Sequence, residues 1–239
     1  MKKDFINYAH RGASEYAPEN TLLSFYTGLF MQANGIETDV QLTKDGVPVL
    51  FHDDTVDRVT DGKGKVYDYT LKELKSLWVL KNGYKDKIIT FEEFLDNFAH
   101  FDLTFAIELK GDKTAIPTAD LIRKFGIENK VIATSFKYNE LLDMRSYAPE
   151  IRTGYLVYNR PIDDELIEQM KADGLFEICP RAPFITLEKC KEWHDKGFSV
   201  RAWGVANEEL MKQVYFAGAD GMTVNFPDKL CELIKNNER

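Results

Sequence analysis

The chain has 239 residues, of which 44% are hydrophobic and 29% are charged, and its formal net charge is -8 at pH 7. This length and composition suit one α/β barrel with a large core and exclude a disordered chain. The acidic balance argues against nucleic acid or an anionic membrane as the main partner, because both attract a basic surface.

The N-terminal part of the chain is predicted to form two strands, a helix and a hairpin. FINYAHRG begins as an apolar run and ends in polar residues, as the C-terminal tip of a barrel strand does. Asn20 or Thr21 is expected to cap the helix and Gly35 to close it. We expect a strand, a helix, a strand, a tight turn and an antiparallel return strand over residues 4–9, 18–35, 36–41, 44–46 and 47–53.

Residues 54–100 interrupt this order. About 45 residues between two barrel strands far exceed a βα loop of a few residues. Residues 71–78 and 90–101 show helical periodicity, whereas the stretch before them is polar and dotted with glycine. We therefore expect a single domain over 1–239 that carries an inserted subdomain over 54–100, placed above the site.

From residue 103 strands and helices alternate regularly. Strands are predicted over 103–110, 131–136, 152–158, 176–181, 198–205 and 219–225, and helices over 115–125, 138–147, 163–172, 186–196, 208–217 and 226–237. Eight apolar strands alternating with helices predict a (β/α)8 TIM barrel with a small inserted subdomain after the second strand and its hairpin. A doubly wound open sheet is the alternative, but no G-x-G-x-x-G fingerprint supports it.

The cysteines and the N-terminus bear on location. Cys179, Cys190 and Cys231 form no CxxC pair and are odd in number, so reduced thiols are expected rather than a disulfide framework. The basic N-terminus is followed by no apolar segment of useful length, so no signal peptide is expected. No apolar run approaches the roughly 18–20 residues that span a bilayer. We expect a soluble, cytoplasmic protein without a membrane span.

Three carboxylates point to a metal site. Glu37 and Asp39 are two apart in a predicted strand, so both side chains project from one face. Two such carboxylates repel each other unless a cation lies between them. Glu108 comes from the next barrel strand, and three carboxylates without Cys or clustered His suit Mg2+ or Ca2+ better than zinc. The alternative is a set of solvated or ion-paired surface carboxylates.

Three motifs resemble the glycerophosphodiester phosphodiesterase family over nearly the whole chain. They are HRG-x5-PENT from His10, E-x-DV-x2-T-x-DG-x-PV-x2-HD from Glu37, and IELK ending at Lys110. The resemblance implies metal-dependent hydrolysis of small-molecule glycerophosphodiesters to glycerol 3-phosphate and an alcohol. It also implies an insertion at this place in the chain, and Glu37, Asp39 and Glu108 as the metal ligands.

His10 and His52, two of the four histidines, are the expected acid/base pair. Hydrolysis of a phosphodiester needs one group that takes a proton and another that gives one to the leaving alcohol, and histidine titrates near neutrality. By analogy with the family, His10 is the base and His52 the acid. Asp53 is expected to order the hairpin near His52, or only to cap a turn.

Two cationic side chains and a tryptophan are expected to bind substrate. The Arg11 fork matches phosphate oxygens, with an ion pair to Glu37 or Glu108 as the alternative. Lys110 follows Glu108 by two residues on the same strand face, where it could hold phosphate or a substrate hydroxyl. Its alternative is an exposed loop lysine. Trp203, at the tip of the seventh strand, is expected to pack on the glycerol carbons, an ordinary core tryptophan being the alternative.

The chain departs from the family at two positions of the mouth. Gly204 stands where the family usually has Thr after the tryptophan, and Asn225 stands where many members carry Asp. Both positions bear on the choice of substrate rather than on the reaction.

Two other functions use the same motif skeleton. One is a lyase-type phospholipase that cleaves lipid phosphodiesters by intramolecular attack, which an exposed apolar or basic docking surface would favour. The other is a non-catalytic barrel that binds phosphate esters, which the loss of a histidine or carboxylate would indicate. The chain is acidic and keeps all of these residues, so hydrolysis is the favoured prediction.

Overall fold

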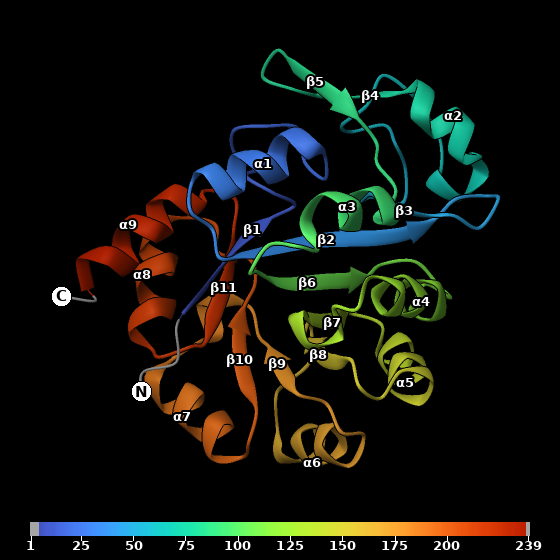
Figure 1. The fold of residues 1–239 in the computed structure, drawn as a ribbon. Coiled ribbons are helices and arrows are strands. Elements are labelled where there is room, and N and C mark those ends of the chain that lie inside the picture. Colours follow the sequence, from blue (N-terminus) through green and yellow to red (C-terminus); the bar gives the residue numbers. More distant parts are fainter. Residues whose placement is uncertain (1–4, 238–239) are drawn as a thin grey trace.

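Eight parallel strands close into a barrel in the computed structural model, which describes residues 5–237 (Figure 1). They are β1 (Ile6–His10), β2 (Gly35–Leu42), β6 (Thr104–Leu109), β7 (Val131–Ser135), β8 (Arg152–Leu156), β9 (Glu177–Cys179), β10 (Ser199–Ala202) and β11 (Gly221–Val224). Neighbours follow in the order β1-β11-β10-β9-β8-β7-β6-β2, and a further β1–β2 pairing closes the ring. The predicted (β/α)8 TIM barrel is confirmed, and the open sheet is excluded.

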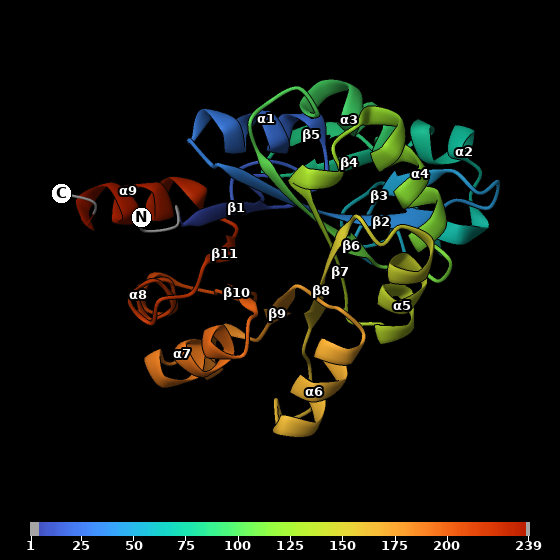
Figure 2. The same ribbon diagram turned by 60° about the horizontal axis from the view of Figure 1, so that its bottom comes forward.

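An outer layer of helices covers the barrel (Figures 1 and 2). It contains α1 (Leu22–Phe30), α3 (Phe91–Phe98), α4 (Ala115–Phe125), α5 (Tyr138–Tyr147), α6 (Asp164–Ala172), α7 (Leu187–Asp195), α8 (Glu208–Phe216) and α9 (Pro227–Asn237). Side chains of Thr21, Thr90, Asp163, Thr186 and Asn207 accept hydrogen bonds from the first turns of their helices. No helix within residues 5–237 is long and apolar enough to cross a membrane.

The first helix is shorter than predicted. It ends at Phe30, and Gly35 is the first residue of β2 instead of the end of the helix. A side chain at Gly35 would meet the Tyr8 ring at 2.7 Å, so glycine is needed here because β1 and β2 lie close together. β1 begins at Ile6, whereas Asp4, the first residue of the predicted strand, lies outside the described residues.

The hairpin after β2 is confirmed. Gly46 donates its N–H to the Thr43 carbonyl at 2.9 Å and has φ +79°, a conformation that glycine adopts without strain. The chain then returns as β3 (Pro48–Leu50), which pairs antiparallel with β2.

Between β3 and α3 the chain forms a layer of small elements beside the barrel (Figure 1). These are η1 (Val66–Asp68), α2 (Leu71–Ser76), β4 (Trp78–Lys81) and β5 (Tyr84–Lys87). Their small core consists of Val49, Phe51, Val56, Val66, Leu74, Val79 and Ile88. α3 also falls within residues 54–100, but it packs on the barrel, where Phe94 meets the Phe105 ring edge-on at 5.7 Å.

Candidate active site

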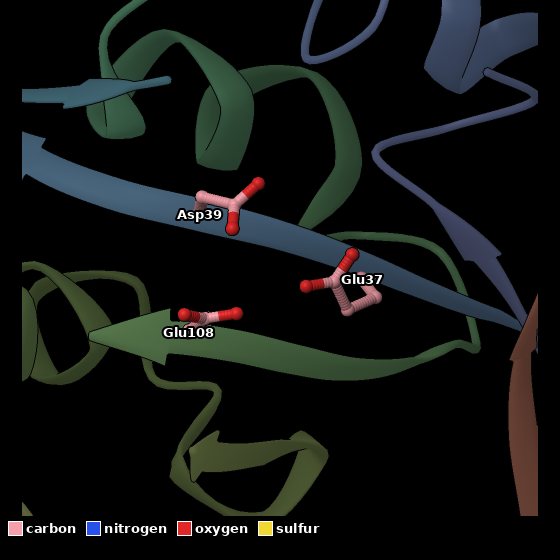
Figure 3. Close-up of side chains that lie close together, drawn as sticks. All are labelled: Glu37, Asp39 and Glu108. Atoms are coloured by element: carbon pink, nitrogen blue, oxygen red, sulfur yellow. The ribbon is translucent and has the colours of Figure 1, made fainter. Parts of the chain in front are cut away.

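Three buried carboxylates face a common space inside the barrel mouth (Figure 3). Glu37 and Asp39 lie on one face of β2, and the parallel register places Asp39 opposite Glu108 of β6. One oxygen from each of the three lies within 4.8 Å of the others. Only 4%, 0% and 6% of these residues is exposed, so they are not solvated surface carboxylates.

The crowding of these groups changes their protonation. Burial and the charges of its two acidic neighbours raise the pKa of Glu37 well above its ordinary value. Burial and then the charge of Asp39 raise the pKa of Glu108 to about 7. Burial acts to raise the pKa of Asp39 too, but the Arg11 guanidinium and other nearby cationic groups lower it to about 2.

A divalent cation fits this cluster. All three residues offer oxygen, the donor that hard cations prefer. Asp39 Oδ1 is buried and has no hydrogen-bond partner among the described residues, which costs free energy unless a cation or another donor meets it. The other oxygen, Oδ2, accepts from Asn20 Nδ2 at 2.9 Å, so the carboxylate is already oriented.

His10 stands at the end of β1, in register with Glu37. Its Nδ1–H donates to Asn225 Oδ1 at 2.5 Å, and its Nε2 lies 3.9 Å from Glu37 Oε2. Ser14 Oγ also donates to Asn225 Oδ1, at 2.9 Å. Burial and then the charge of Arg11 lower the pKa of His10 from 6.5 to about 3. A neutral imidazole with its lone pair on Nε2 is the form that accepts a proton.

His52 follows β3 and lines the same cavity as His10. Its Nδ1–H donates to Asp53 Oδ1 at 2.6 Å, and its Nε2 lies 3.0 Å from Lys110 Nζ. Lys110 Nζ also lies 3.0 Å from Glu108 Oε1. Since an ammonium only donates, His52 Nε2 can carry a proton only when Lys110 donates elsewhere.

Arg11 is ion-paired, although not with the predicted partners. Its Nη1 donates to Glu19 Oε1 at 2.8 Å, and its Nε lies 3.3 Å from Asp39 Oδ2. The contacts between Arg11 and Glu37 involve only the backbone of Arg11. The Arg11 N–H donates to the Glu37 carbonyl at 2.9 Å, and the Arg11 nitrogen lies 3.2 Å from Glu37 Oε2. Arg11 has φ +54°, a strained conformation that these contacts hold.

Most of these groups line one cavity of about 310 Å³ at the barrel mouth. Its walls include His10, Arg11, Glu37, His52, Glu108, Phe136, Arg201, Trp203, Gly204 and Asn225. Trp203 packs edge-on against Phe136, with ring centroids 4.9 Å apart, and Lys110 Nζ lies 5.6 Å from the Phe136 centroid. A larger cavity of about 530 Å³, lined by Val157 and Trp193 among others, contains no predicted site residue. The carboxylates and histidines converge in the smaller one.

The sequence reading missed two features of the site. Arg201 and Glu177 form a buried ion pair in the barrel, with Arg201 Nε 2.9 Å from Glu177 Oε2. Neither residue was predicted to belong to the site, although a charge within a short apolar strand indicates an inward-facing partner. Arg58, in the inserted segment, reaches Asp53 and Glu19, and no local signal marks it.

Known proteins resemble this chain along its length. The sequence model of the glycerophosphoryl diester phosphodiesterase family matches residues 10–229. A glycerophosphodiester phosphodiesterase of Caldanaerobacter subterraneus is 34% identical, with 95% of this chain and 96% of that protein covered. One from Bacillus altitudinis is 31% identical, with 95% and 96% covered. The structure of an Oleispira antarctica phosphodiesterase, in complex with the product sn-glycerol-3-phosphate, is 28% identical with a TM-score of 0.87, and 95% and 96% are covered.

Proposed function

Because this chain belongs to the glycerophosphoryl diester phosphodiesterase family and is a phosphodiesterase, we propose that it hydrolyses glycerophosphodiesters with one divalent cation and two histidines. The products are glycerol 3-phosphate and an alcohol. The observation that carries the proposal is that Glu37 and Glu108, which cluster with Asp39, line one cavity together with His10 and His52. The bound sn-glycerol-3-phosphate of the Oleispira relative supports the choice of substrate class.

Glu37, Asp39 and Glu108 are proposed to hold the cation, and their oxygen donors favour Mg2+ or Ca2+. A divalent cation held by these residues would stabilise negative charge on the phosphate oxygens and would make a nearby water or hydroxyl more acidic. Arg11 and Lys110 add positive charge beside the same space, Arg11 as a planar fork and Lys110 as a point charge. Both are proposed to stabilise the charge that increases on the equatorial oxygens during phosphoryl transfer.

His10 is proposed to act as the base. Its Nδ1–H is held by Asn225, so Nε2 presents its lone pair to the cavity. The low pKa of His10 keeps the imidazole neutral at pH 7 before the reaction. The proton that Nε2 accepts comes from the attacking water or glycerol hydroxyl.

His52 is proposed to act as the acid. When Lys110 turns to a phosphate oxygen, His52 Nε2 is free to carry a proton, and the Asp53 carboxylate stabilises the resulting imidazolium. Nε2 then gives this proton to the departing alcohol. Trp203 and Phe136 offer an apolar wall for the glycerol carbons.

Two further proposals concern organisation and location. The chain is proposed to be one domain over 1–239 with an inserted subdomain over 54–100. The small core described above supports this for the part before α3, which itself packs on the barrel. The protein functions in the cytoplasm, supported by Cys179, Cys190 and Cys231, which are all free thiols.

Product analysis tests the proposed function. Glycerophosphocholine, glycerophosphoethanolamine and a lysophospholipid are each incubated with the protein and Mg2+ or Ca2+, and the products are identified by mass spectrometry. Release of glycerol 3-phosphate from the first two is expected. Exclusive cleavage of the lipid to a cyclic phosphate would show the lyase-type phospholipase instead. Binding of these esters without cleavage would show a non-catalytic barrel.

A further inference from the structure

One guanidinium from the inserted segment contacts two acidic residues of the site. Arg58 Nε and Nη2 donate to the two Asp53 oxygens at 2.5 and 3.0 Å. Arg58 Nη1 and Nη2 donate to the two Glu19 oxygens at 2.9 and 2.7 Å. Both contacts are bidentate, the geometry in which a guanidinium fixes the orientation of a carboxylate.

Each of these carboxylates in turn contacts a proposed active-site residue. Asp53 Oδ1 accepts from His52 Nδ1 at 2.6 Å, and Glu19 Oε1 accepts from Arg11 Nη1 at 2.8 Å. Arg58 therefore connects His52 to Arg11 through the two carboxylates.

We propose that Arg58 is a positioning residue, which fixes the Asp53 carboxylate so that His52 keeps its Nδ1–H toward Asp53 and its Nε2 toward the substrate. This inference rests on the proposed function and adds a role for the inserted segment. His52 makes the proton transfer, and Arg58 acts on it through Asp53.

Arg58 is itself held by the inserted segment. Val56 is buried in the small core there, and Leu80 N–H donates to the Val59 carbonyl at 2.7 Å. The position of the Arg58 side chain thus depends on the folding of residues outside the barrel.

The loop that carries His52 does not depend on Arg58 for its backbone. Gln41 Nε2, from β2, donates to the Phe51 and Asp53 carbonyls at 2.9 and 2.8 Å. Removing Arg58 therefore frees the Asp53 side chain and leaves the backbone on either side of His52 in place. The expected effect is on the reaction, not on the fold.

An ordinary surface ion pair is the competing interpretation. The Arg58 side chain is 49% exposed, and exposed pairs contribute little to stability. The carboxylates are less exposed, at 14% for Glu19 and 24% for Asp53, and the same guanidinium fixes both. The two interpretations differ in which step of the reaction suffers when Arg58 is lost.

The discriminating step is protonation of the leaving group. As the P–O bond breaks, its electron pair goes to the alcohol oxygen, which takes the proton from His52 Nε2 and leaves His52 neutral. Choline is an alkyl alcohol and needs this proton, whereas p-nitrophenolate leaves as a stable anion. Loss of a residue that positions the acid should therefore lower kcat on the choline ester and change kcat on the p-nitrophenyl ester little.

The test compares glycerophosphocholine with the p-nitrophenyl ester of glycerol 3-phosphate, each with the divalent cation present. Arg58→Met is expected to lower kcat on glycerophosphocholine by roughly 10- to 100-fold, the range typical of residues that orient a functional ligand. Its kcat on the nitrophenyl ester and both KM values are expected to change little. Arg123→Met is the matched control, since Arg123 is also partly exposed and ion-paired, with Glu150, on the far helix α4.

A double variant tests whether Arg58 acts through Asp53. Arg58→Met and Asp53→Asn are expected to be strongly non-additive in kcat on glycerophosphocholine, and additive effects would overturn the inference. Arg58→Lys keeps the charge but cannot donate bidentate hydrogen bonds to both carboxylates, so only part of the kcat on glycerophosphocholine is expected to return. Arg58→Lys also replaces Arg58→Met if the methionine variant does not fold. Equal loss on both substrates, or no loss, would also overturn it. If the wild type cleaves neither substrate, the proposed function itself fails.

Discussion

Neutralising one carboxylate of the acidic cluster should stabilise the cation-free protein, and Glu108→Gln is the variant of choice. In the folded protein the pKa of Glu108 is raised from 4.5 to about 7. The folded state therefore binds this proton more tightly than the unfolded state does. Below pH 4.5 Glu108 is protonated in both states and does not lower the free energy of unfolding. Between pH 4.5 and 7 its ionisation lowers that free energy progressively, and above pH 7 the full loss is present.

The magnitude follows from the two pKa values. Their separation corresponds to about 3 kcal/mol at roughly 1.4 kcal/mol for each tenfold change. Part of this gain is lost, because Lys110 Nζ, 3.0 Å from Glu108 Oε1, keeps its charge and loses its partner. A net gain of about 1–2 kcal/mol corresponds to a Tm increase of roughly 2–8 °C for a chain of this size.

Thermal unfolding at pH 8 measures the effect. In EDTA, Glu108→Gln is expected to melt above the wild type. With Mg2+ or Ca2+ at 100 times its Kd, the wild type is expected to gain about 2.7 kcal/mol, and the variant to gain much less. With cation present, the difference between the two melting temperatures should disappear or change sign.

The matched control is Glu140→Gln. Glu140 is also buried, but its carboxylate accepts from the backbone N–H groups of Lys113, Thr114 and Ala115 instead of facing other acids. Its neutralisation should destabilise the protein with or without cation. A Glu108→Gln variant that melts below the wild type in EDTA, or a wild-type Tm that neither cation raises, would refute a destabilising charge at Glu108.

Three other predictions concern single side chains. Asn225→Asp places a carboxylate beside His10 Nδ1 and raises the pKa of His10 above about 3. The acidic limb of the pH profile of kcat/KM should therefore move to higher pH. An unmoved limb would contradict the role of His10 as the base. Lys110→Met should raise KM by roughly tenfold or more, since the proposed charge-assisted hydrogen bond to phosphate would be lost. An unchanged KM in steady-state assays would exclude that contact. Arg201→Met should reduce the free energy of unfolding in urea by about 3–5 kcal/mol, because Glu177 is left as an unpaired buried charge. Adding Glu177→Gln to that variant should recover part of the loss, and no recovery would refute this cause.

The sequence predicted the elements where local signals and packing agree. The bounds of α4 match the prediction residue for residue, because Gly126 ends the helix in the left-handed conformation at φ +64°. The cluster of Glu37, Asp39 and Glu108 was predictable because strand alternation places the first two on one face and the third on the neighbouring strand.

The rest depended on contacts between distant parts of the chain, or on signals that were overlooked. The β4–β5 hairpin was not predicted, although its turn is Asn82–Gly83, both with positive φ, which is a strong hairpin signal. Arg58 gave no such signal, since its contact with Glu19 joins residues 39 apart in sequence. The ion pairs of Arg11 also depend on how the loop after β1 folds back, which spacing alone does not determine.

The carboxylate cluster is proposed to hold a cation on which catalysis by the two histidines depends. The most direct test measures glycerol 3-phosphate release from glycerophosphocholine after EDTA treatment and again after Mg2+ or Ca2+ is restored. Wild type, Glu37→Gln and His10→Ala are compared, and cation binding is measured by calorimetry. We predict that added cation restores activity only in the wild type. Glu37→Gln should lose both cation binding and activity. His10→Ala should bind the cation but be at least roughly 100-fold slower than the wild type. Full wild-type activity in EDTA, or an active Glu37→Gln, would contradict this dependence on the cation.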